Sequence, residues 1–148
     1  MKALIILRHI NSIETVRLYL MERGIECSHV VLDPIELPEN TETAIQFISK
    51  LLAEKPDLII AGTKIFETDN QDKLAQPLRL IEFLKFLHSE GAGQTPICLT
   101  HLMEMPQGLR TEIDKTGLNI HIVENDNLKR DGMSNLGPLI MTALMLKV

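Results

Sequence analysis

The stretch PDLIIAG at residues 56–62 decides the fold of this chain. A proline precedes the continuous apolar run Leu58–Ala61, and a glycine follows it. Uninterrupted apolar runs of this length are typical of strands that are buried on both faces of a parallel sheet. Four other segments have the same character and predict four more strands: Ala3–Leu7, Cys27–Leu32, Pro96–Thr100 and Leu118–Val123.

Amphipathic segments with helical spacing lie between these runs. After the first run, Asn11 and Glu14 have the spacing of a capping box, which predicts a helix beginning at Asn11. Gly24 is placed to end that helix. The remaining helices are predicted from Asn40 or Thr41, from Pro77, around Leu109 and Ile113, and over Leu139–Lys147. Regular alternation of strands and helices predicts one α/β domain over residues 1–148, with a parallel sheet covered on both faces.

Composition and charge narrow the possible partners. Apolar residues make up 45% and charged residues 24% of the chain, which is a globular balance. The net charge of -5 provides no electrostatic attraction for nucleic acid or an anionic membrane. The first apolar run is too short for a signal peptide or membrane span, so we expect a cytoplasmic protein. Cys27 and Cys98 are interpreted as buried thiols without a redox or metal role.

The strand ends are where a binding site is expected. In an open parallel sheet, ligands bind beyond the carboxyl ends of the strands. We therefore expect any binding site at residues 8–12, 33–40, 62–76, 100–106 and 124–135. The connection at 63–76 is long for its type and lies beside this edge, so it is a candidate functional loop.

Three of these strands carry a family resemblance. The run 56–60 (PDLII), the run 96–100 (PICLT) and Leu4–Leu7 with the polar pair after it resemble the corresponding segments of response-regulator receiver domains, the CheY-like superfamily. The resemblance extends over essentially the whole chain. It implies a flavodoxin-like (βα)5 fold, a three-layer α/β sandwich whose parallel sheet has the strand order 2-1-3-4-5.

The residues that carry the chemistry of that family are replaced here. Receivers hold a divalent metal on an acidic pair after the first strand, where this chain has Arg8 and His9. The phosphoacceptor aspartate corresponds to Gly62, and the lysine beyond the fifth strand corresponds to Glu124. Only Thr100, at the position of the switching hydroxyl, is retained. The resemblance therefore implies a degenerate pseudo-receiver that needs no metal or cofactor.

The altered strand ends form a candidate ligand site. Cationic side chains beside a helix N-terminus and a glycine can hold an anion. The site comprises Arg8, His9, Gly62, Thr63, Thr100, His101 and Glu124. A structural alternative is that Arg8 pairs with Asp33 or Glu124 in place of the metal. A histidine could also serve as base for Thr63 or Thr100, but no third orienting group is evident, so no catalytic residue is assigned.

The predicted final helix is apolar around its whole circumference. A helix packed on one side of a sheet should keep a polar side, so this one is a candidate surface for a protein partner or for a homodimer. Its interface residues are Leu139, Ile140, Leu144 and Met145. The sequence thus favours a non-phosphorylatable, receiver-like regulatory module that acts through protein–protein interaction in signal transduction. The alternative is a small-molecule or anion-binding protein, or a small enzyme, that uses the Arg8/His9/His101 edge.

Overall fold

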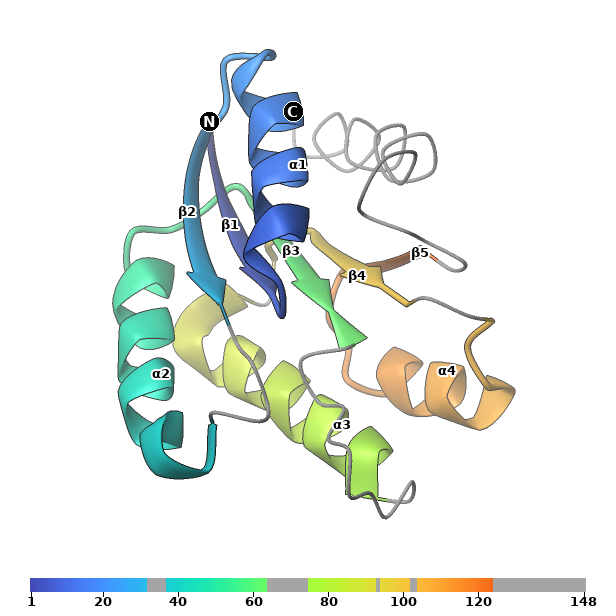
Figure 1. Ribbon diagram of the computed structural model, residues 1–148. Coiled ribbons are helices and arrows are strands. Elements are labelled where there is room, and N and C mark those ends of the chain that lie inside the picture. Colours follow the sequence, from blue (N-terminus) through green and yellow to red (C-terminus); the bar gives the residue numbers. More distant parts are fainter. Residues whose placement is uncertain (32–36, 64–74, 93, 102–103, 124–148) are drawn as a thin grey trace.

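The fold is built on a five-stranded parallel sheet. The computed structural model describes residues 1–31, 37–63, 75–92, 94–101 and 104–123. The strand order is β2-β1-β3-β4-β5 and neighbouring strands are parallel, so the predicted order is confirmed (Figure 1). The strands are β1 (Lys2–Leu7), β2 (Glu26–Val31), β3 (Leu58–Gly62), β4 (Ile97–Thr100) and β5 (Ile120–Val123).

Helices cover both faces of the sheet. In Figure 1, α1 lies on one face, and α2, α3 and α4 lie on the other. The helices are α1 (Ile10–Met21), α2 (Leu37–Leu52), α3 (Ala75–Leu87) and α4 (Gln107–Asp114), and a π-helical turn, η2 (His88–Ala92), continues α3. This is the predicted flavodoxin-like arrangement. The predicted C-terminal helix, with Leu139, Ile140, Leu144 and Met145, lies outside the described residues, as does most of the 63–76 connection.

Two apolar cores follow from the alternation of side chains along the strands. On β1, Leu4 and Ile6 enter the core beneath α2, α3 and α4, whereas Ala3, Ile5 and Leu7 enter the core beneath α1. Every residue of β3 is buried, which explains its continuous apolar sequence. At the opposite end from the candidate site, Lys2 and Asp57 tie β1 to β3: the Lys2 N–H donates to Asp57 Oδ2 at 2.9 Å, and the Asp57 N–H donates to the Lys2 carbonyl at 2.7 Å.

The predicted start of α1 is wrong. The helix begins at Ile10 with His9 as its N-cap, because the His9 carbonyl accepts the first helical hydrogen bond from the Ile13 N–H at 3.1 Å. Asn11 therefore lies inside the first turn, and its side chain caps nothing. Glu14 is bound to Arg17 and does not complete a capping box. The helix ends at Met21 with Glu22 as its C-cap, and Gly24, with φ +75°, completes the turn that follows.

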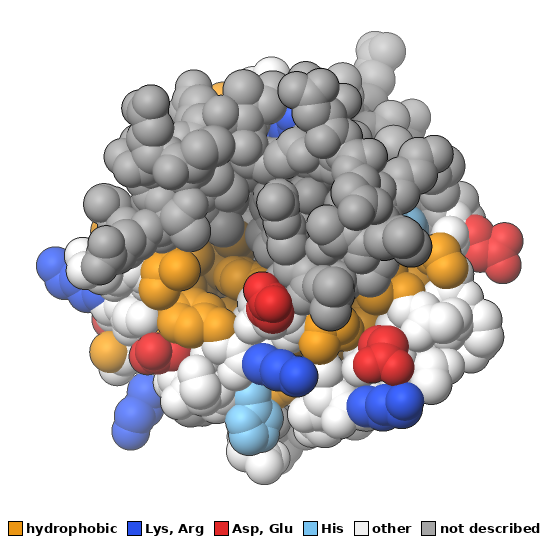
Figure 2. Space-filling view, turned by 90° about the horizontal axis from the view of Figure 1, so that it is seen from below, with side chains coloured by type: hydrophobic (Ala, Val, Ile, Leu, Met, Phe, Trp, Pro, Cys, Tyr) orange, Lys and Arg blue, Asp and Glu red, His pale blue; other side chains and the backbone are white. Residues whose placement is uncertain are grey.

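The described surface carries charges of both signs. The view from below in Figure 2 shows hydrophobic side chains in small groups, with Lys or Arg and Asp or Glu side chains between them. Within the described part of this face, neither sign is gathered into a single patch. None of the helices that the structure describes is long and apolar enough to cross a membrane.

Candidate functional site

The carboxyl ends of β1, β3 and β4 meet at one edge of the sheet because the three strands are parallel neighbours. They end at Leu7, Gly62 and Thr100, and Gly62 is the direct register partner of Thr100. Six of the seven predicted site residues therefore follow or end adjacent strands: Arg8, His9, Gly62, Thr63, Thr100 and His101. Glu124 lies outside the described residues.

A side chain at Gly62 would be crowded by its neighbours. A Cβ atom built on it would lie 2.9 Å from Leu7 Cδ2 and 3.1 Å from Thr100 Oγ1. Carbon atoms in contact are normally about 3.5–4.0 Å apart, so both neighbours would have to move. Leu7 and Thr100 are themselves buried. Side chains of β1 and β4 thus occupy the space that a larger residue would need at the end of β3.

Thr63 and His101 form a direct side-chain contact across the ends of β3 and β4. Thr63 Oγ1 and His101 Nδ1 lie 2.7 Å apart, within hydrogen-bonding distance. The hydroxyl donates if Nδ1 is unprotonated and accepts if Nδ1 carries the proton. The His101 backbone N–H also donates to the Val123 carbonyl at 2.8 Å, which fixes this residue to β5. Since Thr63 is only 8% exposed, its hydroxyl is a satisfied buried group.

Arg8 and His9 follow β1 at the same edge. Arg8 is half-buried with its Nε shielded from solvent, whereas His9 is exposed at the N-terminus of α1. The described residues directly at the ends of β1, β3 and β4 (8–9, 62–63 and 100–101) include no carboxylate. Among the described residues as a whole, no group of three His, Cys, Asp or Glu side chains is placed to hold a metal ion. The described residues of this edge therefore carry one guanidinium, two imidazoles and two hydroxyls.

Cys27 in β2 and Cys98 in β4 are not activated thiols. Burial raises the pKa of the Cys98 thiol to about 12, and Cys98 is fully buried in β4. Burial also raises the pKa of Cys27, although the nearby Arg17 guanidinium partly opposes this effect. Both thiols are therefore protonated near neutral pH, and neither has the lowered pKa of a nucleophilic cysteine.

Two contacts of the site are not predicted by the sequence. One is the position of Leu7 over Gly62, and the other is the choice of Thr63 as the partner of His101. The side-chain alternation of β1 and β3 contains a signal for the first, because Leu7 and Gly62 both point to the face beneath α1. The second follows from the register between Gly62 and Thr100, which no single-strand pattern reveals.

Comparison of the sequence with protein-family models and with curated proteins gives no match. Comparison of the structure with solved structures defines the class of fold: this is the fold of response-regulator receiver domains. The resemblance inferred from the strand-end motifs is therefore confirmed at the level of the fold. Sequence identity to these structures is below one fifth, so the similarity establishes the fold alone.

Three particular structures illustrate the match. The chemotaxis protein CheY4 of Vibrio cholerae is 19% identical, with 97% of this chain and 98% of that chain covered and a TM-score of 0.61. A two-component response regulator from Clostridium difficile is 15% identical, with 98% and 96% covered and a TM-score of 0.62. The response regulator domain of Thermotoga maritima CheB is 15% identical, with 99% and 95% covered and a TM-score of 0.60.

Proposed function

We propose that this chain is a receiver-like regulatory module of signal transduction that acts through protein contacts and does not undergo aspartyl phosphorylation. The observation that carries the proposal is the packing at Gly62. A residue without a side chain stands at the end of β3, and Leu7 and Thr100 occupy the adjoining space. The fold of a receiver is kept, and a side chain at Gly62, the residue that we match to the acceptor aspartate, would be crowded by Leu7 and Thr100.

The charges at the same edge support this proposal. Receiver phosphorylation needs a divalent cation held by carboxylate oxygens. Arg8 and His9 follow β1 where those carboxylates would stand, and a guanidinium repels a metal ion. Metal-dependent phosphoryl transfer to an aspartate therefore lacks both its acceptor and its cation site among the described residues of this edge.

The test is incubation of the full chain with acetyl phosphate and magnesium, followed by intact-mass analysis. We expect no mass increase of one phosphoryl group, either in the wild-type chain or in Gly62→Asp. The substitution restores the carboxylate but leaves Arg8 and His9 in place. Appearance of a hydroxylamine-sensitive phosphoryl group on the wild-type chain would overturn the proposal, because an acyl phosphate requires a working acceptor aspartate or glutamate.

One contact favours a second candidate function at the same edge. Thr63 and His101, 2.7 Å apart, lie at the same edge of the sheet as Arg8 and His9, and hydroxyl, imidazole and guanidinium groups are able to bind a small anion. Titration with inorganic phosphate, followed through the His101 imidazole signals by NMR, tests this alternative. Saturable shifts that are lost in Arg8→Gln support anion binding, and signals that do not respond to phosphate contradict it.

The protein contacts require a surface. The sequence predicts one over Leu139, Ile140, Leu144 and Met145, either for a protein partner or for self-association. These residues lie outside the described part of the chain, so the prediction is retained as part of the proposal. The substitution Leu144→Glu tests it, since a charge within an apolar contact should weaken any association that uses this segment.

A further inference from the structure

One flank of α1 carries exposed apolar residues at its two ends and an ion pair between them. Ile10, Glu14, Arg17 and Met21 are spaced four, three and four positions apart, which places them on the same side of the helix. Ile10 is 48% exposed and Met21 is 52% exposed. We call these four residues the α1 stripe. Leu18, 54% exposed, lies next to it.

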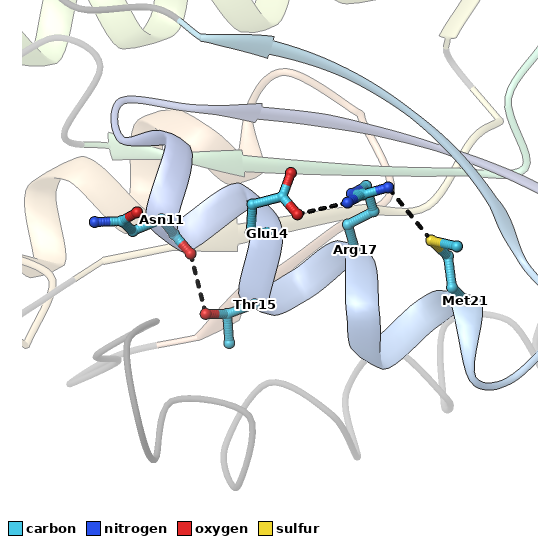
Figure 3. Close-up of polar contacts among 5 residues, drawn as sticks. All are labelled: Asn11, Glu14, Thr15, Arg17 and Met21. Carbon is cyan, nitrogen blue, oxygen red and sulfur yellow. Dashed lines mark hydrogen bonds and ion pairs between the residues drawn. The ribbon is translucent and has the colours of Figure 1, made fainter.

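The charged centre of the stripe is held in a defined geometry. Arg17 Nη2 donates to Glu14 Oε2 at 2.5 Å, and Arg17 Nη1 lies 3.6 Å from Met21 Sδ (Figure 3). The hydrogen bond from Arg17 lowers the pKa of Glu14, so the carboxylate is charged at neutral pH. The two side chains remain 34% and 40% exposed, and both charges are therefore within reach of a partner molecule.

The stripe borders an open hollow at the edge of the sheet. The hollow has a volume of about 530 Å³ and is lined by Arg17, Met21 and residues 24–27. Residues 26–27 belong to β2, which pairs with β1 and is the edge strand among the strands that the structure describes. The α1 stripe therefore lies on an outer flank of the domain, where it can meet another molecule without disturbing the core.

The positions of the stripe residues are symmetric about the middle of the helix, and reading the stripe from the other end exchanges the acid and the base. An apolar residue stands at each end, and two opposite charges lie symmetrically about the middle of the helix, between Thr15 and Val16. If two such helices pack antiparallel, each acid faces a base and each apolar end faces an apolar end. A surface that is complementary to itself in this way suits a two-fold contact between identical chains.

We propose that the α1 stripe is the contact surface for a second copy of this chain, with the two α1 helices antiparallel across a two-fold axis. Glu14 then pairs with the partner's Arg17, and Ile10 packs against the partner's Met21. A different protein would need its own base opposite Glu14 and its own acid opposite Arg17. A second copy of this chain already carries both charges in the required order. The inference deepens the proposed function, on which it rests, by naming the protein that is contacted.

Charge substitutions in the stripe test this arrangement by sedimentation equilibrium of the full chain over micromolar concentrations. R17E leaves two carboxylates in each stripe, and E14R leaves two cations, so each variant alone should associate about tenfold more weakly than the wild type. A mixture of R17E and E14R should regain association. The double variant E14R/R17E exchanges the two charges and should dimerise as the wild type does, because its stripe is again complementary to itself.

A matched control is available on α4. Lys115 and Glu112 form an exposed pair with the same spacing, at 3.2 Å. K115E removes an ion pair and changes the net charge as R17E does, but it should leave association unchanged. Circular dichroism of each variant checks that it is folded.

Four results would overturn the inference. They are a wild-type chain that stays monomeric, equal weakening by R17E and K115E, a double variant that does not dimerise, and association that is lost in Leu144→Glu but kept in R17E. The last result places the contact in the C-terminal segment. None of them bears on the phosphorylation test, so failure of the inference and failure of the proposed function remain distinguishable.

Discussion

Substitution of Gly62 by alanine tests the packing on which the proposed function depends. The backbone of Gly62 is outside the left-handed region, so alanine can adopt it without strain in φ. Replacement of a glycine under that condition stabilises a protein by about 0.4–1 kcal/mol through the unfolded state. The new Cβ, however, would lie 2.9 Å from Leu7 Cδ2 and 3.1 Å from Thr100 Oγ1. Overpacking of a buried position costs about 1–3 kcal/mol.

The steric cost exceeds the entropic gain because Leu7 is only 3% exposed and cannot turn its end into solvent. We therefore expect Gly62→Ala to lower the free energy of unfolding by about 1–2 kcal/mol. Urea denaturation followed by circular dichroism measures this change, with the slope m checked for constancy. A Gly62→Ala chain that equals or exceeds the wild type in stability would refute the steric account.

A double-mutant cycle identifies the atom responsible. Leu7→Val removes the δ carbons of the leucine and should cost about 1 kcal/mol by itself. In that background Gly62→Ala should be tolerated better, with a favourable coupling of about 1 kcal/mol. Strict additivity of the two substitutions would show that Leu7 is not the neighbour that excludes a side chain at the end of β3.

Three further predictions concern other parts of the chain. Thr63→Val should lower the free energy of unfolding by about 1–3 kcal/mol, because the His101 imidazole loses its hydroxyl partner, whereas Thr63→Ser should cost less; equal costs in urea denaturation would contradict a role for the hydrogen bond. In a Cys27→Ser chain, Cys98 should react with a thiol reagent only on unfolding, since burial raises the pKa of Cys98 to about 12; rapid native labelling would argue against this burial. Gly108→Ala in α4 should raise the free energy of unfolding by about 0.5–1 kcal/mol, because nothing lies within 4 Å of the new Cβ; a loss of stability in the same assay would show an unseen clash.

The sheet could be predicted well because its strands are buried by tertiary contacts that leave a continuous apolar pattern. The second strand was predicted at Cys27–Leu32 and is found at Glu26–Val31. The fifth strand is shorter than predicted, since the Ile120 N–H bonds back to the Leu118 carbonyl in a turn before the strand begins. The start of α1 was missed for a different reason. A capping box is a local sequence signal. Here the helix begins at Ile10, soon after β1 ends at Leu7, so its start is set by the position of the strand end.

The sequence predicts which residues belong to the candidate site but not which of their side chains are in contact. Parallel strands bring their carboxyl ends to one edge, and this was sufficient to name Arg8, Thr63 and His101 together. Which of these side chains touch depends on the register between strands, and a single sequence contains no direct signal for it. The α1 stripe was missed because Glu14 was interpreted as part of a cap. The i,i+3 spacing of Glu14 and Arg17 is a sequence signal for this ion pair, which the capping-box interpretation leaves unused.

The place of β1 between β2 and β3 also sets an order for folding. Residues 2–31 contain β1, α1 and β2, but the other edge of β1 pairs with β3, more than fifty residues away in sequence. A nascent chain that stops before Gly62 therefore holds a strand with an open, apolar edge, which is prone to pair with other chains. Closure of that edge also brings Asp57 to Lys2, which adds two hydrogen bonds to a strand that β2 already holds on its other side.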